Sequence, residues 1–366
     1  MPDRRFVQKI DWGLLGLVFT LGALGLTTLY SAVTAGADVS QTLCLRQFIW
    51  YCAGLLLMVI SVLFDYKMLE RWSHVIYCIC VLLLICVLLF GKFVGGSRRW
   101  LAFGPVSVQP SEMIKIAVVI VLARYYSKLV SVRGFTLREL SVPMIVTGIP
   151  FALIAKQPDL GTAMVVLLIA SSVTLFVKIE RRSLACLFSV CTVSIPLVWF
   201  CLKEYQRVRI LTFLNPDRDP LGSGYHIIQS KIAIGSGVVF GRGFRKGTQN
   251  ALSFLPEQHT DFIFSVLAEE SGFVGSLLML LIFLLLIIWG LNIAHGCREP
   301  FGTILAVGVT AMIFWQVFIN IGMVMGLMPV VGVPLPFISY GGSSVITMMI
   351  CVGILLNVSM RRFTIE

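Results

Sequence analysis

Long apolar segments separated by short polar stretches dominate the chain. Ten segments are long enough for membrane-spanning helices, because a hydrocarbon core of about 30 Å requires about 20 apolar residues. They are residues 12–33, 48–64, 75–90, 110–126, 142–155, 160–177, 184–202, 262–293, 301–325 and 343–358. The first is too long for a signal peptide and has no small-residue cleavage site, so we expect a retained helix. The pattern predicts an all-α polytopic membrane protein, with residues 1–366 as one domain.

Composition supports this class. Of 366 residues, 58% are hydrophobic and 13% charged, whereas soluble domains carry about 25% charge. A soluble globular domain is therefore excluded, and so is a disordered chain. Ten cysteines are present. Most lie inside the apolar segments, where cysteine acts as a small hydrophobic residue, and no zinc-ligand spacing accompanies them.

The net charge is +11, from 29 Lys and Arg against 18 Asp and Glu. In a soluble protein this charge would suggest a nucleic acid partner, but in a membrane protein it has another explanation. Cationic loops on the cytoplasmic side explain it without a nucleic acid partner. With a cytoplasmic N-terminus, 15 cations fall on the cytoplasmic side and 5 in the short external loops. This bias predicts ten spans with both termini cytoplasmic. One large extracytoplasmic loop, residues 203–261, then joins the seventh and eighth spans.

Charged residues at span ends are the informative ones, because charge inside a bilayer is costly. Glu112 and Lys115 are three residues apart at the start of the fourth span, so they share a helix face. They form either an ion pair with a structural role or the floor of a polar cavity. Asp159 opens the sixth span. It is a candidate helix cap, and a cap can also face a shared cavity.

The large loop is rich in Arg and Lys, which suits an anionic ligand. It contains Arg207 and Arg209 and ends at Asp261, where the eighth span begins. Partial desolvation there favours a carboxylate that accepts a proton near neutral pH, so Asp261 is a candidate general base. The alternatives are a helix cap, or a metal site with Glu257 and His259. The glycines lack the context of a phosphate-binding loop.

A fourth polar stretch, residues 334–344, is uncharged and rich in Pro and Gly. Irregular backbone at membrane depth is tolerated only where protein or a water-filled cavity surrounds it. We interpret the stretch, which includes Ser343, as a re-entrant turn lining the same cavity. A plain tight loop is the alternative.

Four motifs in order resemble those of the SEDS family (shape, elongation, division and sporulation), and the resemblance covers nearly the whole chain. They are Gln109-Pro110-Ser111-Glu112, Gln157-Pro158-Asp159-Leu160-Gly161-Thr162, Pro256-Glu257-Gln258-His259-Thr260-Asp261-Phe262-Ile263 and Pro334-Leu335-Pro336-Phe337-Ile338-Ser339-Tyr340-Gly341-Gly342. The compact ends resemble the rod-shape (RodA-like) branch more than the division branch.

The resemblance implies a peptidoglycan glycosyltransferase that polymerises lipid II at the outer face of the bacterial cytoplasmic membrane. It implies a class B penicillin-binding protein, a transpeptidase, as partner within the elongation complex. It assigns the essential loop aspartate to Asp261, the buried ion pair to Glu112 and Lys115, a second cavity acid to Asp159 and a family arginine to Arg46. His259 and Ser343 lie within its motifs and are further candidates for substrate binding.

The expected reaction joins the 4-hydroxyl of an acceptor sugar to C1 of a donor glycan on undecaprenyl pyrophosphate, with inversion. Asp261 would take the proton. Positive charge for the leaving pyrophosphate would come from Arg207, Arg209, Lys115 or a divalent cation, Mg²⁺ or Mn²⁺. No soluble cofactor is required. Two alternatives are a lipid II flippase and a non-catalytic scaffold that activates the transpeptidase.

Overall fold

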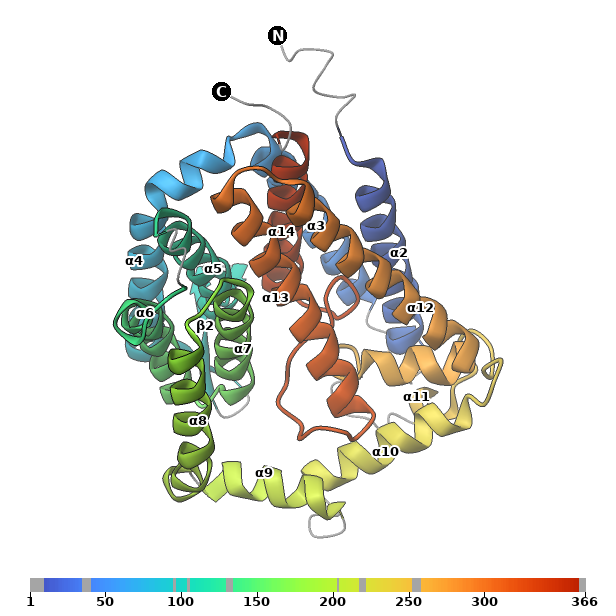
Figure 1. Cartoon of the computed structure of the whole chain (residues 1–366). Helices are drawn as coiled ribbons and strands as arrows, with labels where there is room; N and C mark the ends of the chain where they lie inside the picture. Colours follow the sequence, from blue (N-terminus) through green and yellow to red (C-terminus); the bar gives the residue numbers. More distant parts are fainter. Residues whose placement is uncertain are drawn as a thin grey trace.

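The computed structural model describes residues 10–34, 41–94, 97–103, 106–129, 134–202, 204–216, 222–251 and 258–361. Ten long helices in the described part of the chain form a bundle (Figure 1). They are α2 (Trp12–Thr34), α3 (Gln41–Leu63), α4 (Tyr66–Phe90), α5 (Pro110–Lys128), α6 (Leu137–Lys156), α7 (Leu160–Phe176), α8 (Arg181–Cys201), α12 (Ile263–Gly296), α13 (Pro300–Val324) and α14 (Gly342–Arg361). Each predicted apolar segment falls on one of them and extends past it by no more than one residue. Seven are long and apolar enough to cross a membrane by themselves, and the count of ten spans stays a prediction.

The expectation of an all-α chain is wrong between α4 and α5. There β1 (Lys92–Val94), β2 (Ser97–Phe103) and β3 (Val106–Val108) form an antiparallel sheet in the order β1-β2-β3. In the second pairing, Leu101 lies opposite Val108. Short β-forming runs separated by Gly-Gly and Gly-Pro are a hairpin signal. The sheet was therefore predictable from the sequence, but a search for long apolar segments does not detect strands this short.

The connection between α8 and α12 is largely helical in its described part. It contains α9 (Glu204–Leu214), α10 (Ser223–Ser236) and the short α11 (Thr248–Ala251). Figure 1 shows α9 and α10 lying across one end of the bundle. α12 then runs for 34 residues with a kink at Gly272, whose φ of 66° suits glycine.

The two ends of the bundle are distinct. At one end α2 begins and α14 finishes, and Trp289 Nε1 and Ser359 Oγ donate to Asp11 at 2.8 and 3.5 Å. The other end holds α9 and α10 and the starts of α5, α7, α12 and α14 (Figure 1). We call it the motif end, because Glu112, Asp159 and Asp261 all lie at it.

Two prolines inside α6 do not end the helix. A proline in a helix leaves the carbonyl four residues earlier without its usual donor. Tyr77 Oη donates to Val146 O, the carbonyl before Pro150, at 2.9 Å. Tyr125 Oη donates at 2.6 Å to the carbonyl four residues before Pro143. Neighbouring helices therefore supply the missing partners, and α6 keeps its 20 residues.

Burial differs strongly between helices. α13 and α14 are buried along most of their length and form the centre of the bundle. α3, α4 and α12 present many exposed apolar side chains, such as Phe90 at 79%. Large apolar surfaces of this kind need a lipid environment or a partner. The fold is therefore a multi-pass membrane bundle with its core on α5, α13 and α14.

Candidate active site

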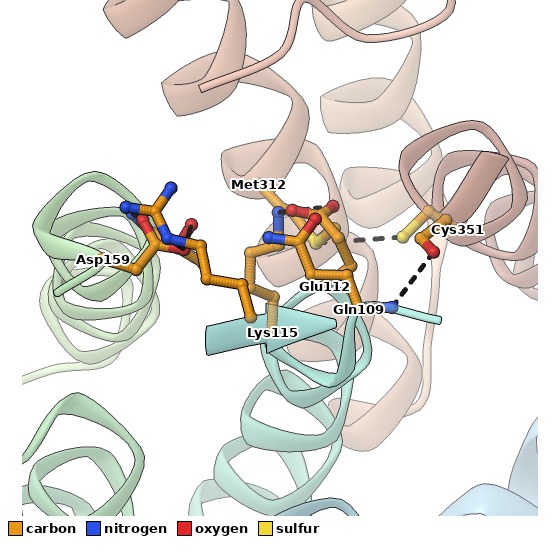
Figure 2. A network of polar contacts seen from close by, with 9 residues as sticks. Gln109, Glu112, Lys115, Asp159, Met312 and Cys351 are labelled. Atoms are coloured by element: carbon orange, nitrogen blue, oxygen red, sulfur yellow. Dashed lines mark hydrogen bonds and ion pairs between the residues drawn. The ribbon is translucent and has the colours of Figure 1, made fainter. Parts of the chain in front are cut away.

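The start of α5 carries a buried ion pair. Pro110 occupies the first turn, where its missing N–H costs nothing. Lys115 Nζ lies 2.8 Å from both carboxylate oxygens of Glu112, and each residue is 1% exposed. Figure 2 shows the pair beside Met312 of α13 and Cys351 of α14. The structure thus brings Glu112 and Lys115 into contact, as their spacing predicted, and encloses them in protein.

Asp159 caps α7. Its carboxylate accepts from Thr162 N at 3.3 Å and from Thr162 Oγ1 at 3.0 Å. The sequence analysis did not single out Arg99 of β2 as a site residue, yet its Nε lies 3.7 Å from Asp159 Oδ2. Arg99 also donates to Pro158 O at 2.7 Å. Asp159 is 1% exposed and the Arg99 side chain 25%, so this pair connects the buried cap to the surface of the motif end.

Asp261 occupies a different environment. α12 starts at Ile263 with Phe262 as its cap residue, so Asp261 lies one residue outside the cap position. Its main-chain oxygen accepts from Asn320 Nδ2 at 3.0 Å, and the same amide donates to Val333 O at 2.7 Å. Asp261 is partly exposed. Its backbone is therefore fixed by a buried amide, while the residue remains open to the motif end.

The segment after α13 holds the residues before Asp261 in place. Tyr340 N donates to His259 O at 3.0 Å, and Ser339 Oγ donates to Thr260 O at 2.7 Å. On its other side, Gln47 Nε2 of α3 donates to Ser339 O at 3.1 Å. Residues 258–261 are thus tied to the turn, and the turn is tied to the bundle.

The same segment also touches the other two acidic regions. A Cβ on Gly161, beside Asp159, would lie 2.4 Å from Val331 O, and a Cβ on Gly332 would lie 3.2 Å from Asp261 Oδ2. At the start of α14, Ser343 Oγ accepts from the main-chain N of Gln109, the cap residue of α5, at 3.1 Å.

Residues 331–343 therefore link the starts of α5, α7 and α12. The segment is irregular between Val324 and Gly342 and strongly buried, with Leu335 and Phe337 at 1%. Tyr51 of α3 donates to Phe337 O. This agrees with the predicted turn surrounded by protein, and the length of the segment between Val324 and Gly342 disagrees with the alternative of a plain tight loop.

The predicted arginines lie on other elements. Arg46 is exposed on α3, next to Gln47, and Arg209 is partly exposed on α9. Arg207 donates to Trp199 O at 3.1 Å and to Phe200 O at 2.8 Å, so its guanidinium group covers the carbonyl end of α8. The two hydrogen bonds from Arg207 therefore hold α9 beside the end of α8.

A metal site is not formed by the described residues, which contain no cluster of three His, Cys, Asp or Glu side chains. Glu257, a member of the alternative considered with His259 and Asp261, lies outside the described residues. The His259 ring instead packs against Tyr340, with 6.0 Å between centroids. A metal bound by Glu257, His259 and Asp261 together therefore stays an untested alternative.

Sequence reasoning missed Gln47 and Asn320, which orient the main chain of the site. Both are buried polar residues within apolar helices, at 1% and 0% exposure. An isolated amide in an apolar segment is a recognisable signal, because an amide without a partner is expensive there. Their partners could not be inferred, since they lie 292 and 59 residues away.

Proteins of known function resemble this chain in sequence and fold. Residues 10–363 match the sequence profile of the FtsW, RodA and SpoVE family, described as cell cycle proteins. The peptidoglycan glycosyltransferase MrdB of Escherichia coli K12 is 41% identical over 363 residues, 99% of this chain and 97% of that protein. A chain from a solved peptidoglycan synthase complex that coordinates polymerization and crosslinking is 35% identical, with TM-score 0.83, covering 97% of this chain and 98% of that one. The Thermus thermophilus rod shape determining protein RodA is 29% identical, with TM-score 0.72, covering 97% and 98%.

Proposed function

Because this chain belongs to the FtsW, RodA and SpoVE family, we propose that it is a peptidoglycan glycosyltransferase that polymerises lipid II during cell elongation. The full-length similarity to MrdB supports the activity. One structural observation carries the site assignment. A partly exposed carboxylate, Asp261, is held by a buried amide at the end of the bundle where the other motif residues gather.

Asp261 acts as the general base. It takes the proton of the acceptor 4-hydroxyl as the oxygen attacks C1 of the donor, and the bond to undecaprenyl pyrophosphate breaks with inversion. A positioned base of this kind contributes about 10²- to 10⁴-fold. Fixing the Asp261 main chain through Asn320 matters because proton transfer requires the two heavy atoms within hydrogen-bond reach.

Positive charge must meet the leaving pyrophosphate. Lys115 is a poor candidate, because its ammonium group is buried and bonded to both oxygens of Glu112. We assign the pair to the architecture of the site. Arg99 is the better candidate, because it is partly exposed and adjoins Asp159. Arg46, Arg207 and Arg209 are further candidates for binding the substrate. A divalent cation that arrives with the substrate is another possible source of positive charge. Ser343 and His259 position the turn and the loop.

The reaction takes place on the extracytoplasmic side of the cytoplasmic membrane, with both termini in the cytoplasm. The positive-inside bias supports this orientation, and α2 begins at the end opposite the motif residues (Figure 1). In a variant lacking the native cysteines, Asp261→Cys should react with a membrane-impermeant maleimide added outside intact cells. Labelling only after the inner face is exposed would reverse the orientation.

A class B penicillin-binding protein is the proposed partner. A structural neighbour belongs to a peptidoglycan synthase complex that coordinates polymerization and crosslinking. The exposed apolar faces of the outer helices offer surface for a partner's membrane helix. Co-purification of the two full-length proteins tests this pairing.

Incubation of the purified protein with lipid II, followed by a product gel, tests the function. A glycosyltransferase gives a ladder of glycan strands without the partner's transpeptidase activity. A flippase moves lipid II across vesicles without a ladder, and a scaffold does neither. A ladder that persists undiminished with Asp261→Asn would contradict the site while leaving the activity standing.

A further inference from the structure

α8 is separated from its neighbours by an apolar cavity. The cavity has a volume of about 380 Å³ and lies between α6, α7 and α8. Its walls include Gly148 and Phe151 of α6, Leu167 and Leu175 of α7, and Phe188 of α8. α8 makes few contacts with the other helices, and Figure 1 shows it at the side of the bundle. The cavity is open on one side, because wall residues such as Leu175 and Phe188 are 59% and 64% exposed. Its apolar walls therefore need a lipid or another apolar group to cover them.

The cavity lies away from the candidate active site. Asp159 and Leu160 mark the end of α7 nearest the site, whereas the cavity is lined by the later part of α7, residues 167–175. On α8 it is lined by residues 184–188, near the start of that helix. Most of its walls thus belong to the half of the bundle opposite the motif end, although on α6 they reach Phe151, and the proposed reaction does not use them.

Arginines stand at the helix starts beside this cavity. Arg138 lies two residues before Leu140, a wall residue of α6, and Arg181 and Arg182 directly precede the part of α8 that lines the cavity. All three are exposed. The main chains of the two regions are joined, because Phe135 N donates to Lys178 O at 3.0 Å.

This charge is not balanced locally. Only two acids, Glu139 and Glu180, belong to the same helix starts as the three arginines. Glu139 is committed to the capping box of α6, where it accepts from Thr136 N at 2.8 Å. Within the described chain, no hydrogen bond or ion pair joins the guanidinium groups of Arg138, Arg181 or Arg182 to another residue. The charge therefore suits an anionic group outside the protein.

We propose that the α6–α7–α8 cavity and these arginines form a binding site for one anionic glycerophospholipid of the cytoplasmic leaflet. An acyl chain fills the cavity and replaces the missing packing between α8 and the bundle. The phosphate group lies among Arg138, Arg181 and Arg182 at headgroup depth. The lipid then acts as a structural element that holds α8, and through Arg207 the start of α9, against the bundle.

Native mass spectrometry of the full-length protein, with phosphatidylglycerol and phosphatidylcholine of identical acyl chains, tests the proposal. We expect wild-type protein to retain phosphatidylglycerol preferentially. Arg181→Gln with Arg182→Gln should weaken phosphatidylglycerol binding about tenfold or more, because each interfacial cation attracts anionic lipid. The control, Lys67→Gln with Arg71→Gln at the start of α4, removes the same charge elsewhere and should change binding less than about twofold.

Gly148→Phe tests the cavity itself. A Cβ on Gly148 has no atom within 4 Å, so the ring can enter the space and should reduce retention of both lipids. Gly16→Phe on α2 also starts from open space and serves as the control. Size-exclusion profiles establish that each variant is folded.

Equal retention of the two lipids by wild-type protein, or full retention by folded Gly148→Phe, would overturn the site. Preferential retention of undecaprenyl pyrophosphate over phosphatidylglycerol, abolished by Gly148→Phe, would overturn the assignment to a glycerophospholipid.

Discussion

Glu112 and Asp261 are both carboxylates at the motif end, yet their surroundings differ, and so do the roles that we propose for them. Glu112 is 1% exposed and both its oxygens are bonded to Lys115. Asp261 is partly exposed, and it is the main chain that the buried Asn320 fixes. A carboxylate that is enclosed in protein and bonded to a buried cation cannot accept a substrate proton at low cost, whereas a partly exposed carboxylate can be reached by a substrate. We therefore propose a catalytic role for Asp261 and a structural role for Glu112.

The largest expected effect lies on the Asp261 side of this comparison. Asp261→Asn keeps the shape and removes the proton acceptor, so glycan polymerisation should fall by about 10²- to 10⁴-fold. Thermal unfolding should stay close to that of wild type, because the main-chain bond from Asn320 is retained. A product gel with purified variant and lipid II provides the measurement, and near wild-type product would refute the general-base role.

Substitutions in the Glu112–Lys115 pair should mainly lower the stability of the protein. Glu112→Gln or Lys115→Met leaves one buried charge without its partner, which should cost about 3–5 kcal/mol of unfolding free energy. Lys128→Met removes an exposed cation from the same helix and should stay within about 0.5 kcal/mol.

The charge-swapped double variant, Glu112→Lys with Lys115→Glu, should recover much of this loss because the pair is restored. Recovery should be incomplete, since a cation now lies in the first turn of α5, where the helix dipole disfavours it. Thermal unfolding in detergent supplies the double-mutant cycle. Purely additive losses would contradict the coupling.

A substitution of Asn320 should affect both the stability of the protein and its activity. Asn320→Leu removes the donor to Asp261 O and Val333 O and should cost about 1–3 kcal/mol. It should also lower polymerisation about 10- to 100-fold, because a displacement of about 1 Å in the base is that costly.

Asn357 of α14 provides a matched control for this prediction. It is 2% exposed and its amide donates to Ser61 O at 2.7 Å, at the end opposite the motif residues. Asn357→Leu should destabilise the protein similarly and leave the specific activity of the folded fraction unchanged. Equal activity losses in the two variants would mean that Asn320 acts through general stability.

The smallest expected stability effect concerns Arg99. Its ion pair with Asp159 is 3.7 Å long and partly exposed, and such pairs are worth about 0–1 kcal/mol. Arg99→Gln should therefore change unfolding little and raise the KM for lipid II, if Arg99 meets the pyrophosphate. Arg98→Gln, an exposed neighbour on β2, is the control. Identical KM values for both variants would remove Arg99 from the substrate site.

The positions of the helices were determined by the sequence itself. Each of the ten apolar segments lies on one of the ten long helices and extends past it by no more than one residue, because a run of about 20 apolar residues has few alternatives in a membrane. Several helices begin earlier than the apolar pattern predicted, such as α4, which begins at Tyr66 and not at residue 75. The Glu112–Lys115 pair was also predictable, since three-residue spacing places both side chains on one face of α5. The small sheet could have been recognised from its turn residues, but a count of apolar segments does not register seven-residue strands.

Only the tertiary structure decided how the motifs meet. Asn320 reaches Asp261, Ser343 reaches Gln109 and Gln47 reaches Ser339 across separations of 59 to 292 residues. Helix periodicity contains no information about such pairings, because they depend on how helices pack against one another. Packing also decided that Lys115 is enclosed, that Arg207 covers the end of α8 and that Arg99 adjoins Asp159. The sequence identifies which charged side chains could take part in the chemistry. Their burial and their bonding partners, which only the tertiary structure gives, determine which of them remain candidates.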